Sequence, residues 1–160
     1  MKVSLITVST SRYEKLSKGI RFSDESGTIA FDLVKSAGFN VTSPKTVDDS
    51  TPMIRQGLLK CIYDDGSDAV ILIGGTGLAK RDITIESVSP LLDKELNGFA
   101  EIFRAVSFKE IGTSAYLSRC IAGCLDGRMV YCLPGSPQAV KTALELILPE
   151  LPHALYIARS

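Results

Sequence analysis

The fold is decided by residues 69 to 84, which read Ala69-Val70-Ile71-Leu72-Ile73-Gly74-Gly75-Thr76-Gly77-Leu78-Ala79-Lys80-Arg81-Asp82-Ile83-Thr84. The first five residues are apolar, and three of them are β-branched. A helix of these five residues would be too short to stand alone, and the segment has no polar side. The pattern therefore predicts a parallel strand that is buried on both faces.

A turn rich in glycine follows this strand at once. Gly74, Gly75 and Gly77 lack a Cβ, so the backbone can adopt positive φ and a ligand can approach the main-chain N–H groups. Such groups bind oxyanions through the dipoles of their peptides. Thr76 adds a hydroxyl to the same turn. We therefore predict an oxyanion site here; the alternative is a strand-to-helix turn in which the glycines serve the backbone geometry alone.

Charged residues complete the stretch. Lys80 and Arg81 supply positive charge for an anion, and Asp82 supplies a carboxylate suited to a hydrated divalent cation. Ligands of open α/β sheets bind where strands end, which favours a binding site over a solvated charged loop. The glycine spacing matches neither the Walker A motif nor GxGxxG, so the functions that those motifs indicate do not follow.

Length and charge limit the classes of protein to consider. The chain has 160 residues, with 18 Lys plus Arg and 18 Asp plus Glu. The length predicts a single domain over residues 1–160, and the balanced charge leaves no basic field for nucleic acid. The apolar runs fall short of the about 20 residues that a membrane span requires, and the N-terminus begins a strand rather than a signal peptide. We therefore expect no membrane partner and a cytoplasmic location.

The cysteines do not have the spacing of a metal site. Cys61, Cys120, Cys124 and Cys132 form no CxxC pair, and the only histidine is His153, near the C-terminus. We interpret the cysteines as small buried hydrophobic residues and expect no zinc.

Two further strands end in polar residues. Asp48 and Asp49 follow the apolar residue Val47 and precede a helix, a position that also suits simple compensation of the helix dipole. The second of these ends reads Leu133-Pro134-Gly135-Ser136-Pro137, where Ser136 can cap a helix that begins at Pro137. Free N–H groups at that helix end would form a second oxyanion site, although the sequence also suits a plain helix entry.

Alternating strands and helices indicate a mostly parallel sheet, and the turn signal Asp126-Gly127 adds one antiparallel hairpin. We expect a polar loop over residues 9–12 and a long flexible connection over residues 13–21, which lack an apolar period. Residues 91–106 have helical spacing. The last helical stripe ends before Pro149, and the tail after it docks or frays.

Right-handed crossovers bring the carboxyl ends of parallel strands to one rim, so the three polar ends should share a site. Such a site would hold two anionic groups, with Asp49 and Asp82 left for Mg²⁺. Arg104 and Arg119 could reach a phosphate, although a solvated or ion-paired side chain is the default. The chain has no Ser-His-Asp, Cys-His or zinc constellation, so phosphoryl or nucleotidyl transfer remains, which needs positioned charge, a metal and exclusion of water.

The motifs occur in an order that resembles the MoaB/MogA family of molybdenum-cofactor biosynthesis. The resemblance covers nearly the whole chain. It is carried by residues 74–84, Lys94-Glu95, residues 98–104, Ile111-Gly112-Thr113-Ser114-Ala115, Leu117-Ser118-Arg119 and residues 133–137, with Asp24-Glu25-Ser26-Gly27 and the Asp49 region also similar.

The resemblance implies a three-layer α/β fold, the molybdopterin-binding domain fold, with a mostly parallel sheet, helices on both faces and homo-oligomeric assembly as trimers or hexamers. It implies Mg²⁺- and ATP-dependent adenylylation of molybdopterin, and contacts with other proteins of the same biosynthesis. Asp49 and Asp82 fall on the family's essential acidic positions, for catalysis and metal. The family's ligand loops correspond to Gly74, Gly75, Thr76, Gly77, Arg81, Gly135 and Ser136. Phe99, Phe103 and Phe108 are candidates for subunit contacts as well as for the core.

Two other interpretations are open. A protein of the same fold could hold or transfer molybdopterin without chemistry, and it would need Asp49 and Asp82 for affinity only. A nicotinamide-dependent oxidoreductase on a Rossmann-like sheet would require GxGxxG and an acidic residue about 20 positions later, which the chain lacks.

Overall fold

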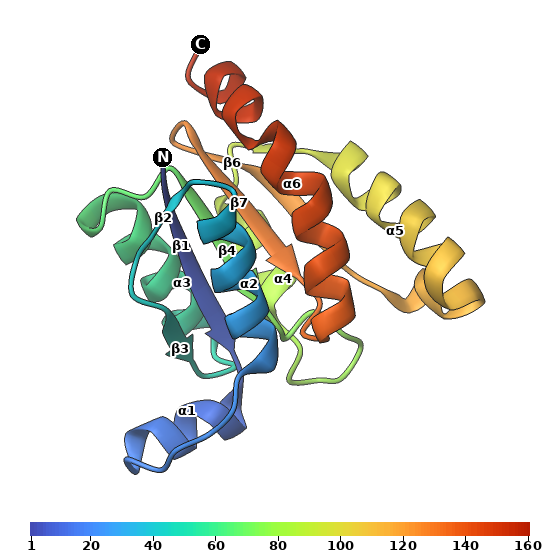
Figure 1. Ribbon diagram of the computed structural model, residues 1–160. Coiled ribbons are helices and arrows are strands. Elements are labelled where there is room, and N and C mark those ends of the chain that lie inside the picture. Colours follow the sequence, from blue (N-terminus) through green and yellow to red (C-terminus); the bar gives the residue numbers. More distant parts are fainter.

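The computed structural model describes residues 1–160, which form one seven-stranded sheet flanked by helices (Figure 1). The spatial order is β2-β1-β4-β7-β6-β5, and β3 pairs with the second half of β1. The pairs from β2 to β7 are parallel, whereas β7 with β6 and β6 with β5 are antiparallel. The strands are β1 (Lys2–Val8), β2 (Asn40–Val41), β3 (Lys45–Val47), β4 (Ala69–Ile73), β5 (Lys94–Glu95), β6 (Ile121–Leu125) and β7 (Arg128–Leu133).

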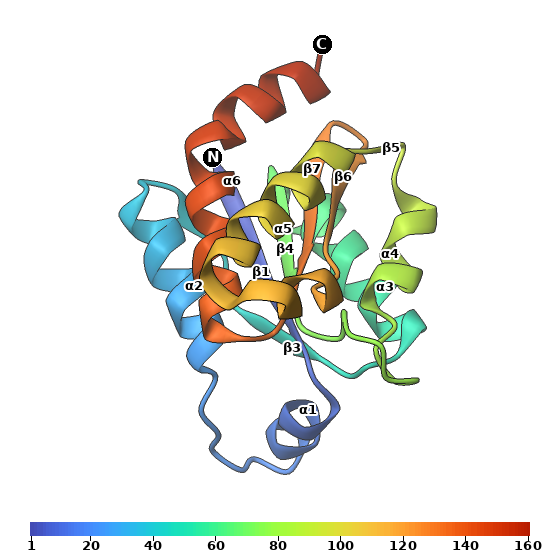
Figure 2. The same ribbon diagram turned by 90° about the vertical axis from the view of Figure 1, so that its right-hand side faces the viewer.

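Helices cover both faces of the sheet, as expected for a three-layer α/β fold (Figure 2). One face packs against α2, α5 and α6, and the other against α3 and α4. The helices are α1 (Thr10–Ser17), α2 (Glu25–Ser36), α3 (Thr51–Leu59), α4 (Thr84–Val88), α5 (Asn97–Ile111) and α6 (Pro137–Ala158). A π-helical turn, Lys60–Asp64, extends α3, and 3₁₀ turns span Ser89–Leu91 and Gly112–Leu117. None of these helices has the length and apolar character needed to cross a membrane.

The predicted central strand is confirmed. All five residues of β4 are buried, and its side chains alternate between the two cores. Ile71 and Ile73 face the helices α2, α5 and α6, while Val70 and Leu72 face α3 and α4. A strand between two helical layers needs apolar residues on both sides, which is why β4 shows a continuous rather than an alternating apolar run.

The predicted hairpin is also confirmed. Asp126 and Gly127 join β6 to β7 with φ of 48° and 68°. Positive φ at both central residues matches the right-handed twist of the flanking strands.

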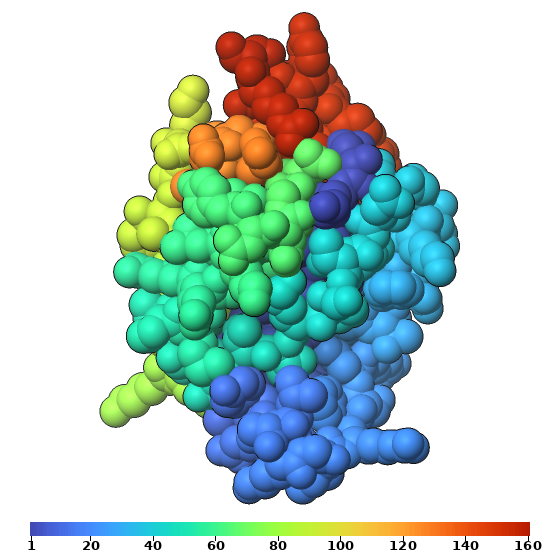
Figure 3. Space-filling view, turned by 90° about the vertical axis from the view of Figure 1, so that its left-hand side faces the viewer, coloured from blue at the N-terminus to red at the C-terminus, as the bar shows by residue number.

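The helix α1 occupies most of the polar loop expected over residues 9–12 and the first half of the connection expected over residues 13–21. No residue of α1 is buried, and the helix projects beyond the carboxyl ends of the strands (Figure 1). In the space-filling view this N-terminal segment, in blue, forms the lower end of the molecule (Figure 3). The helix begins with a cap, because the Ser9 Oγ accepts a hydrogen bond from the Arg12 N–H at 3.4 Å. The absence of an apolar period was therefore a correct observation, but it did not exclude a helix.

The chain after Pro149 is part of α6, and the prediction that the helical stripe ends there is wrong. Pro149 and Pro152 both lie inside the helix. Leu151 is fully buried and Leu155 is 3% exposed, so packing against the sheet holds this half of the helix in place. Tertiary packing of this kind outweighs the low helix propensity of proline.

The helix expected over residues 91–106 is shifted. Residues 94 and 95 form the edge strand β5, which pairs with Cys124 and Gly123 of β6, and α5 starts only at Asn97. A two-residue charged edge strand has no periodicity that the sequence could reveal.

Three of the four cysteines are buried, and Cys124 alone is partly exposed. Burial raises the pKa of the Cys120 thiol to about 11, in spite of the nearby positive charge of Arg104. Because the thiolate is the reactive form, a raised pKa leaves little reactive Cys120 at pH 8. We expect a disulfide-exchange reagent at pH 8 to label one thiol, Cys124, within minutes in the native protein. All four should react in denaturant, and rapid reaction of two or more thiols before unfolding would contradict this burial.

Candidate active site

The ends of β1, β4 and β7 meet at one rim of the sheet. The Gly74 N–H donates to the Leu133 carbonyl of β7 at 3.0 Å. Gly74 has φ of 101°, and a Cβ on it would lie 2.6 Å from the Val8 carbonyl oxygen of β1. A Cβ on Gly135 would lie 3.3 Å from the Gly74 Cα. The two predicted glycine loops are therefore direct neighbours.

Both loops present unused backbone donors. The N–H groups of four consecutive residues, 75 to 78, donate to no acceptor in the protein. The N–H groups of Gly135 and Ser136 are also without an acceptor. Backbone donors in turns and at helix N-termini suit anions. The rim thus carries two adjacent groups of donors, as the sequence predicted.

Asp49 is held between α1 and the glycine turn. Its Oδ2 accepts hydrogen bonds from both the Thr10 N–H, at 2.8 Å, and the Thr10 hydroxyl, at 2.9 Å. Its Oδ1 faces Gly75 and would lie 2.9 Å from a Cβ at that position. The start of α1 therefore orients this carboxylate toward the turn.

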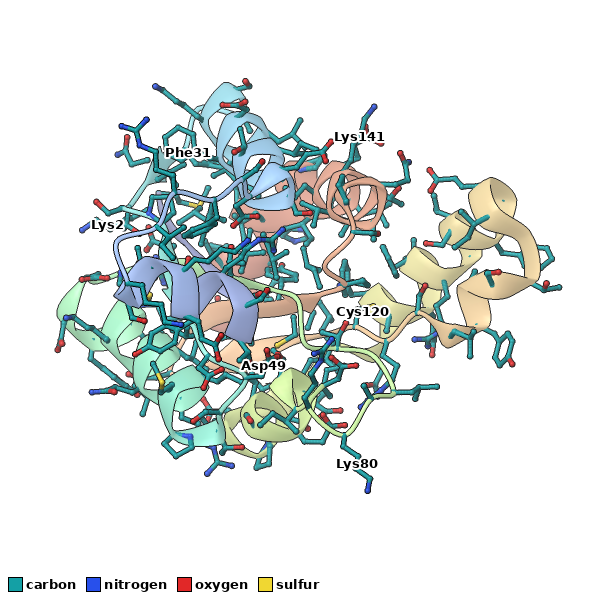
Figure 4. The ribbon with its side chains drawn as sticks, turned by 90° about the horizontal axis from the view of Figure 1, so that it is seen from below. Lys2, Phe31, Asp49, Lys80, Cys120 and Lys141 are labelled. Carbon is teal, nitrogen blue, oxygen red and sulfur yellow. The ribbon has the colours of Figure 1, made fainter.

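Asp82 lies beside Gly77, further along the turn, and the oxygen that faces the turn is the one that already accepts a hydrogen bond. Its Oδ2 accepts a hydrogen bond from the Ala79 N–H at 3.0 Å and would lie 2.6 Å from a Cβ on Gly77. In Asp49 and Asp82 alike, one oxygen accepts backbone hydrogen bonds and the other accepts none. Lys80, from the same loop, extends outward and away from Asp49 (Figure 4).

This arrangement fits Mg²⁺ rather than a metal held by protein alone. No group of three or more His, Cys, Asp or Glu side chains is gathered anywhere in the structure. Mg²⁺ usually binds through one or two carboxylates, with substrate phosphates and water completing its shell. Asp49 and Asp82, which lie beside the free amides of the glycine turn, are the carboxylates that could hold such an ion.

Ser136 caps α6, as predicted. Its Oγ accepts a hydrogen bond from the Ala139 N–H at 3.3 Å, and Pro137 occupies the first helical position. The cap leaves the Ser136 N–H free at the helix end.

We expect Ser136→Ala to lower the free energy of unfolding by about 1 kcal/mol, the usual cost of losing such a cap. Urea denaturation followed by circular dichroism would measure it. Ser136→Asp should retain the stability, because Asp also caps helices, but its negative charge should weaken anion binding at the rim. Unchanged stability in Ser136→Ala would mean that the cap contributes nothing.

The cationic residues have different roles from one another. Arg81 is exposed and forms no ion pair, so it is available to a ligand. Arg119 is occupied, because it donates to the Gly77 carbonyl at 2.8 Å and pairs with Glu86. Burial alone raises the pKa of Glu86, but the hydrogen bond from Arg119 brings it below its ordinary value. Arg119 thus follows the ion-paired alternative instead of the phosphate contact.

The sequence did not identify three hydroxyl residues around the rim. Thr10 orients Asp49, the Thr84 hydroxyl donates to the Gly74 carbonyl at 2.8 Å, and the Ser26 hydroxyl donates to the Gly135 carbonyl at 2.7 Å. Ser26 and Thr84 lie in motifs of the family resemblance, which was the only signal available. Thr76, the predicted hydroxyl of the turn, is 4% exposed.

A separate apolar cleft of about 490 Å³ is lined in part by Lys94, Met129, His153 and Ile157. Met129 lies at the start of β7, opposite Ala69 at the start of β4. The cleft is therefore at the far end of the sheet and contains none of the predicted site residues.

Known proteins are similar to this chain in sequence and in overall fold. A family described as "Probable molybdopterin binding domain" matches residues 4–153. "Molybdenum cofactor biosynthesis protein B" of Bacillus cereus is 43% identical over 158 residues, covering 98% of this chain and 89% of the relative. "Molybdopterin adenylyltransferase" of Pyrococcus furiosus is 43% identical, covering 99% and 91%. A crystal structure of a molybdenum cofactor biosynthesis protein B superposes with a TM-score of 0.90 at 42% identity, covering 99% of this chain and 96% of that one.

Proposed function

Because the chain belongs to the MoaB family of probable molybdopterin-binding domains, we propose that it is a molybdopterin adenylyltransferase that uses ATP and Mg²⁺. The family expected from the motifs is thus confirmed, and with it a role in molybdenum cofactor biosynthesis. We propose further that residues 1–160 act as a single molybdopterin-binding domain.

One observation supports the chemistry above all others. The two loops of free amides lie against each other, with Asp49 and Asp82 beside the first of them. An adenylyl transfer must bring two anionic groups together, the attacking phosphate and the α-phosphate of ATP. Neighbouring donor loops are what this step requires.

The proposed step is a displacement at phosphorus. An oxygen of the terminal phosphate of molybdopterin forms a bond to the α-phosphorus of ATP. The bond from that phosphorus to the bridging oxygen breaks, and its electron pair leaves with pyrophosphate. The attacking phosphate is already ionised at neutral pH, so the chain need not supply a nucleophile, and positioning and charge stabilisation suffice.

The side chains of the rim have distinct roles in this proposal. The amides of residues 75–78 and of Gly135 and Ser136 bind and orient the phosphates, and Arg81 and Thr76 add donors at the first loop. Asp49 and Asp82 would hold Mg²⁺, which supplies charge neutralisation for the phosphates when bound. Catalysis would therefore come from positioning by groups on three different strand ends.

The test is to mix the protein with molybdopterin, ATP and Mg²⁺ and to follow adenylylated pterin and pyrophosphate. The double variant Asp49→Asn, Asp82→Asn is the control. Product from the native protein alone would support the enzyme and its acidic pair together. Absence of product, with pterin binding that is weaker in the double variant, would favour a carrier of the same fold. Binding of NADH in a separate titration would favour the oxidoreductase.

We also propose that the chain forms a homo-oligomer in the cytoplasm. Phe103 is fully buried and Phe99 is 9% exposed, so these two rings belong to the core. Phe108 is 58% exposed on α5, close in sequence to the exposed Ile111 and Tyr116, and an apolar helix surface of this kind suits a subunit contact. Light scattering on the purified protein would give the mass, and a monomer at micromolar concentration would contradict the assembly.

A further inference from the structure

We infer that Thr84, Arg119 and Ser26 are positioning residues that fix the direction of the phosphate-binding amides by holding the carbonyl groups of the same peptides. The inference rests on the proposed function and assigns roles to three residues outside the predicted site. Each peptide bond is planar and no peptide is cis, so a carbonyl and the following N–H point in opposite directions. A donor that holds the carbonyl on one side therefore aims the N–H toward the other.

Thr84 holds two consecutive peptides of the glycine turn. Its hydroxyl donates to the Gly74 carbonyl at 2.8 Å, and its N–H donates to the Gly75 carbonyl at 2.9 Å. The N–H groups of these two peptides belong to Gly75 and Thr76, and neither has an acceptor. Thr84 is fully buried at the start of α4, so the restraint comes from a fixed element.

Arg119 holds the next carbonyl along the turn. Its guanidinium donates to the Gly77 carbonyl at 2.8 Å, and the N–H of that peptide, on Leu78, is free. The ion pair with Glu86 of α4 keeps the guanidinium in place. A charged donor shared between a carbonyl and a carboxylate gives a stronger and more directional contact than a neutral one.

Ser26 does the same for the second loop. Its hydroxyl, which belongs to a residue 2% exposed on α2, donates to the Gly135 carbonyl at 2.7 Å. The N–H of that peptide belongs to Ser136 and is free. Four peptides in two loops thus share one pattern. The carbonyl accepts a hydrogen bond from elsewhere in the protein, and the N–H has no acceptor.

This pattern explains how glycine loops can bind phosphate without reorganising. Glycine has the largest backbone freedom of any residue, so an unrestrained turn would sample many amide directions. Donors that are aimed before the ligand arrives cost no reorganisation when charge develops. The restraint comes from Thr84 of α4, from Arg119 in the segment before β6, and from Ser26 of α2.

The experiment titrates inorganic pyrophosphate, with Mg²⁺ present, into the ¹⁵N-labelled protein and follows the amide resonances. In the native protein we expect the shifts to concentrate on the four aimed amides, which belong to Gly75, Thr76, Leu78 and Ser136. Thr84→Val keeps the shape of the buried side chain but removes the hydroxyl that holds the Gly74 carbonyl. The Gly75 N–H would then no longer be aimed at the ligand. Loss of its hydrogen bond to the charged pyrophosphate should weaken binding roughly tenfold. Thr84→Ser restores the hydroxyl and should restore the affinity.

Ser26→Ala is the second variant, and it carries the test if Thr84→Val does not fold. Its matched control is Ser67→Ala, since Ser67 is a fully buried serine with one hydroxyl contact, to Ser4 at 2.7 Å, just before the start of β4. Ser67→Ala should leave the affinity unchanged. Native-like affinity in both Thr84→Val and Ser26→Ala, or shifts confined to other amides, would overturn the inference.

The same samples separate this inference from the proposed function. If the native protein shows the expected shifts but forms no adenylylated pterin, the proposed adenylyltransferase activity is contradicted. The inference that these amides are aimed at a phosphate is then still supported. If the native protein forms adenylylated pterin but Thr84→Val and Thr84→Ser bind pyrophosphate equally, the proposed activity is supported. The positioning role of the Thr84 hydroxyl is then contradicted.

Discussion

Asp82→Asn is expected to lower the rate of adenylylation by about 10²-fold or more while leaving the fold intact, because a positioned metal ligand contributes several kcal/mol to such a step. The substitution keeps an oxygen that can accept the hydrogen bond from the Ala79 N–H, which is 3.0 Å long in the native protein. What it removes is the negative charge beside the glycine turn. A single-turnover assay with saturating ATP and Mg²⁺, together with the thermal midpoint of unfolding, measures both effects.

The matched control is Asp93→Asn. Asp93 also accepts one backbone hydrogen bond through its Oδ2, from the Asp126 N–H at 2.7 Å, but it lies beside the β6–β7 hairpin. Loss of its charge should change neither the rate nor the fold appreciably. A rate for Asp82→Asn within a few-fold of native would remove this carboxylate from the chemistry.

The parts of the fold that the sequence predicted are those with a local cause. The run Ala69–Ile73 is apolar on both sides because two cores enclose it, and Asp126-Gly127 is a hairpin turn because both residues must adopt positive φ. Each pattern can be read within a few residues. The meeting of the strand ends at one rim followed from general rules of handedness, whereas the order of the strands was not predicted.

The helix α1 was missed because its cause is tertiary. It buries no residue, so it leaves no apolar period in the sequence. Its first turn is held instead by Ser9 and by the carboxylate of Asp49, which is 39 residues away from Thr10 in the chain. Such a contact cannot be found from periodicity.

The error at Pro149 has the opposite origin. Proline removes a helical hydrogen bond and clashes with the preceding turn, so a local rule ends the helix there. Burial of Leu151 and Leu155 against the sheet overrides that rule. Local rules therefore fail here where an element is held by contacts remote in sequence.

The residues of the candidate site likewise include some that the sequence could identify and some that it could not. Glycines and acids at strand ends mark the loops, so Gly74, Gly135, Asp49 and Asp82 could be named from the sequence. The donors that hold the loop carbonyls come from α4, α2 and the segment before β6, and their side chains resemble ordinary helix caps and surface charges. Only the three-dimensional structure relates them to the loops.

Gly75→Ala is expected to lower the rate of adenylylation by on the order of 10²-fold or more, because small displacements of positioned groups have effects of that size. A Cβ at this position would lie 2.4 Å from the Thr84 hydroxyl and 2.9 Å from the Asp49 Oδ1. One methyl group would therefore displace both the residue that holds the turn and a carboxylate of the proposed metal site. The rate constant and pyrophosphate affinity should fall together.

Gly66→Ala separates this displacement from backbone strain. Gly66 has φ of 64°, nearly the 65° of Gly75, but a Cβ on it would meet no atom within 4 Å. Both substitutions carry a similar cost of about 1 kcal/mol or more for a left-handed residue with a side chain. If strain alone mattered, the two variants would lose stability equally and keep their activity. Loss of activity in Gly75→Ala alone would show that the absence of a side chain at this position serves the site and not only the turn.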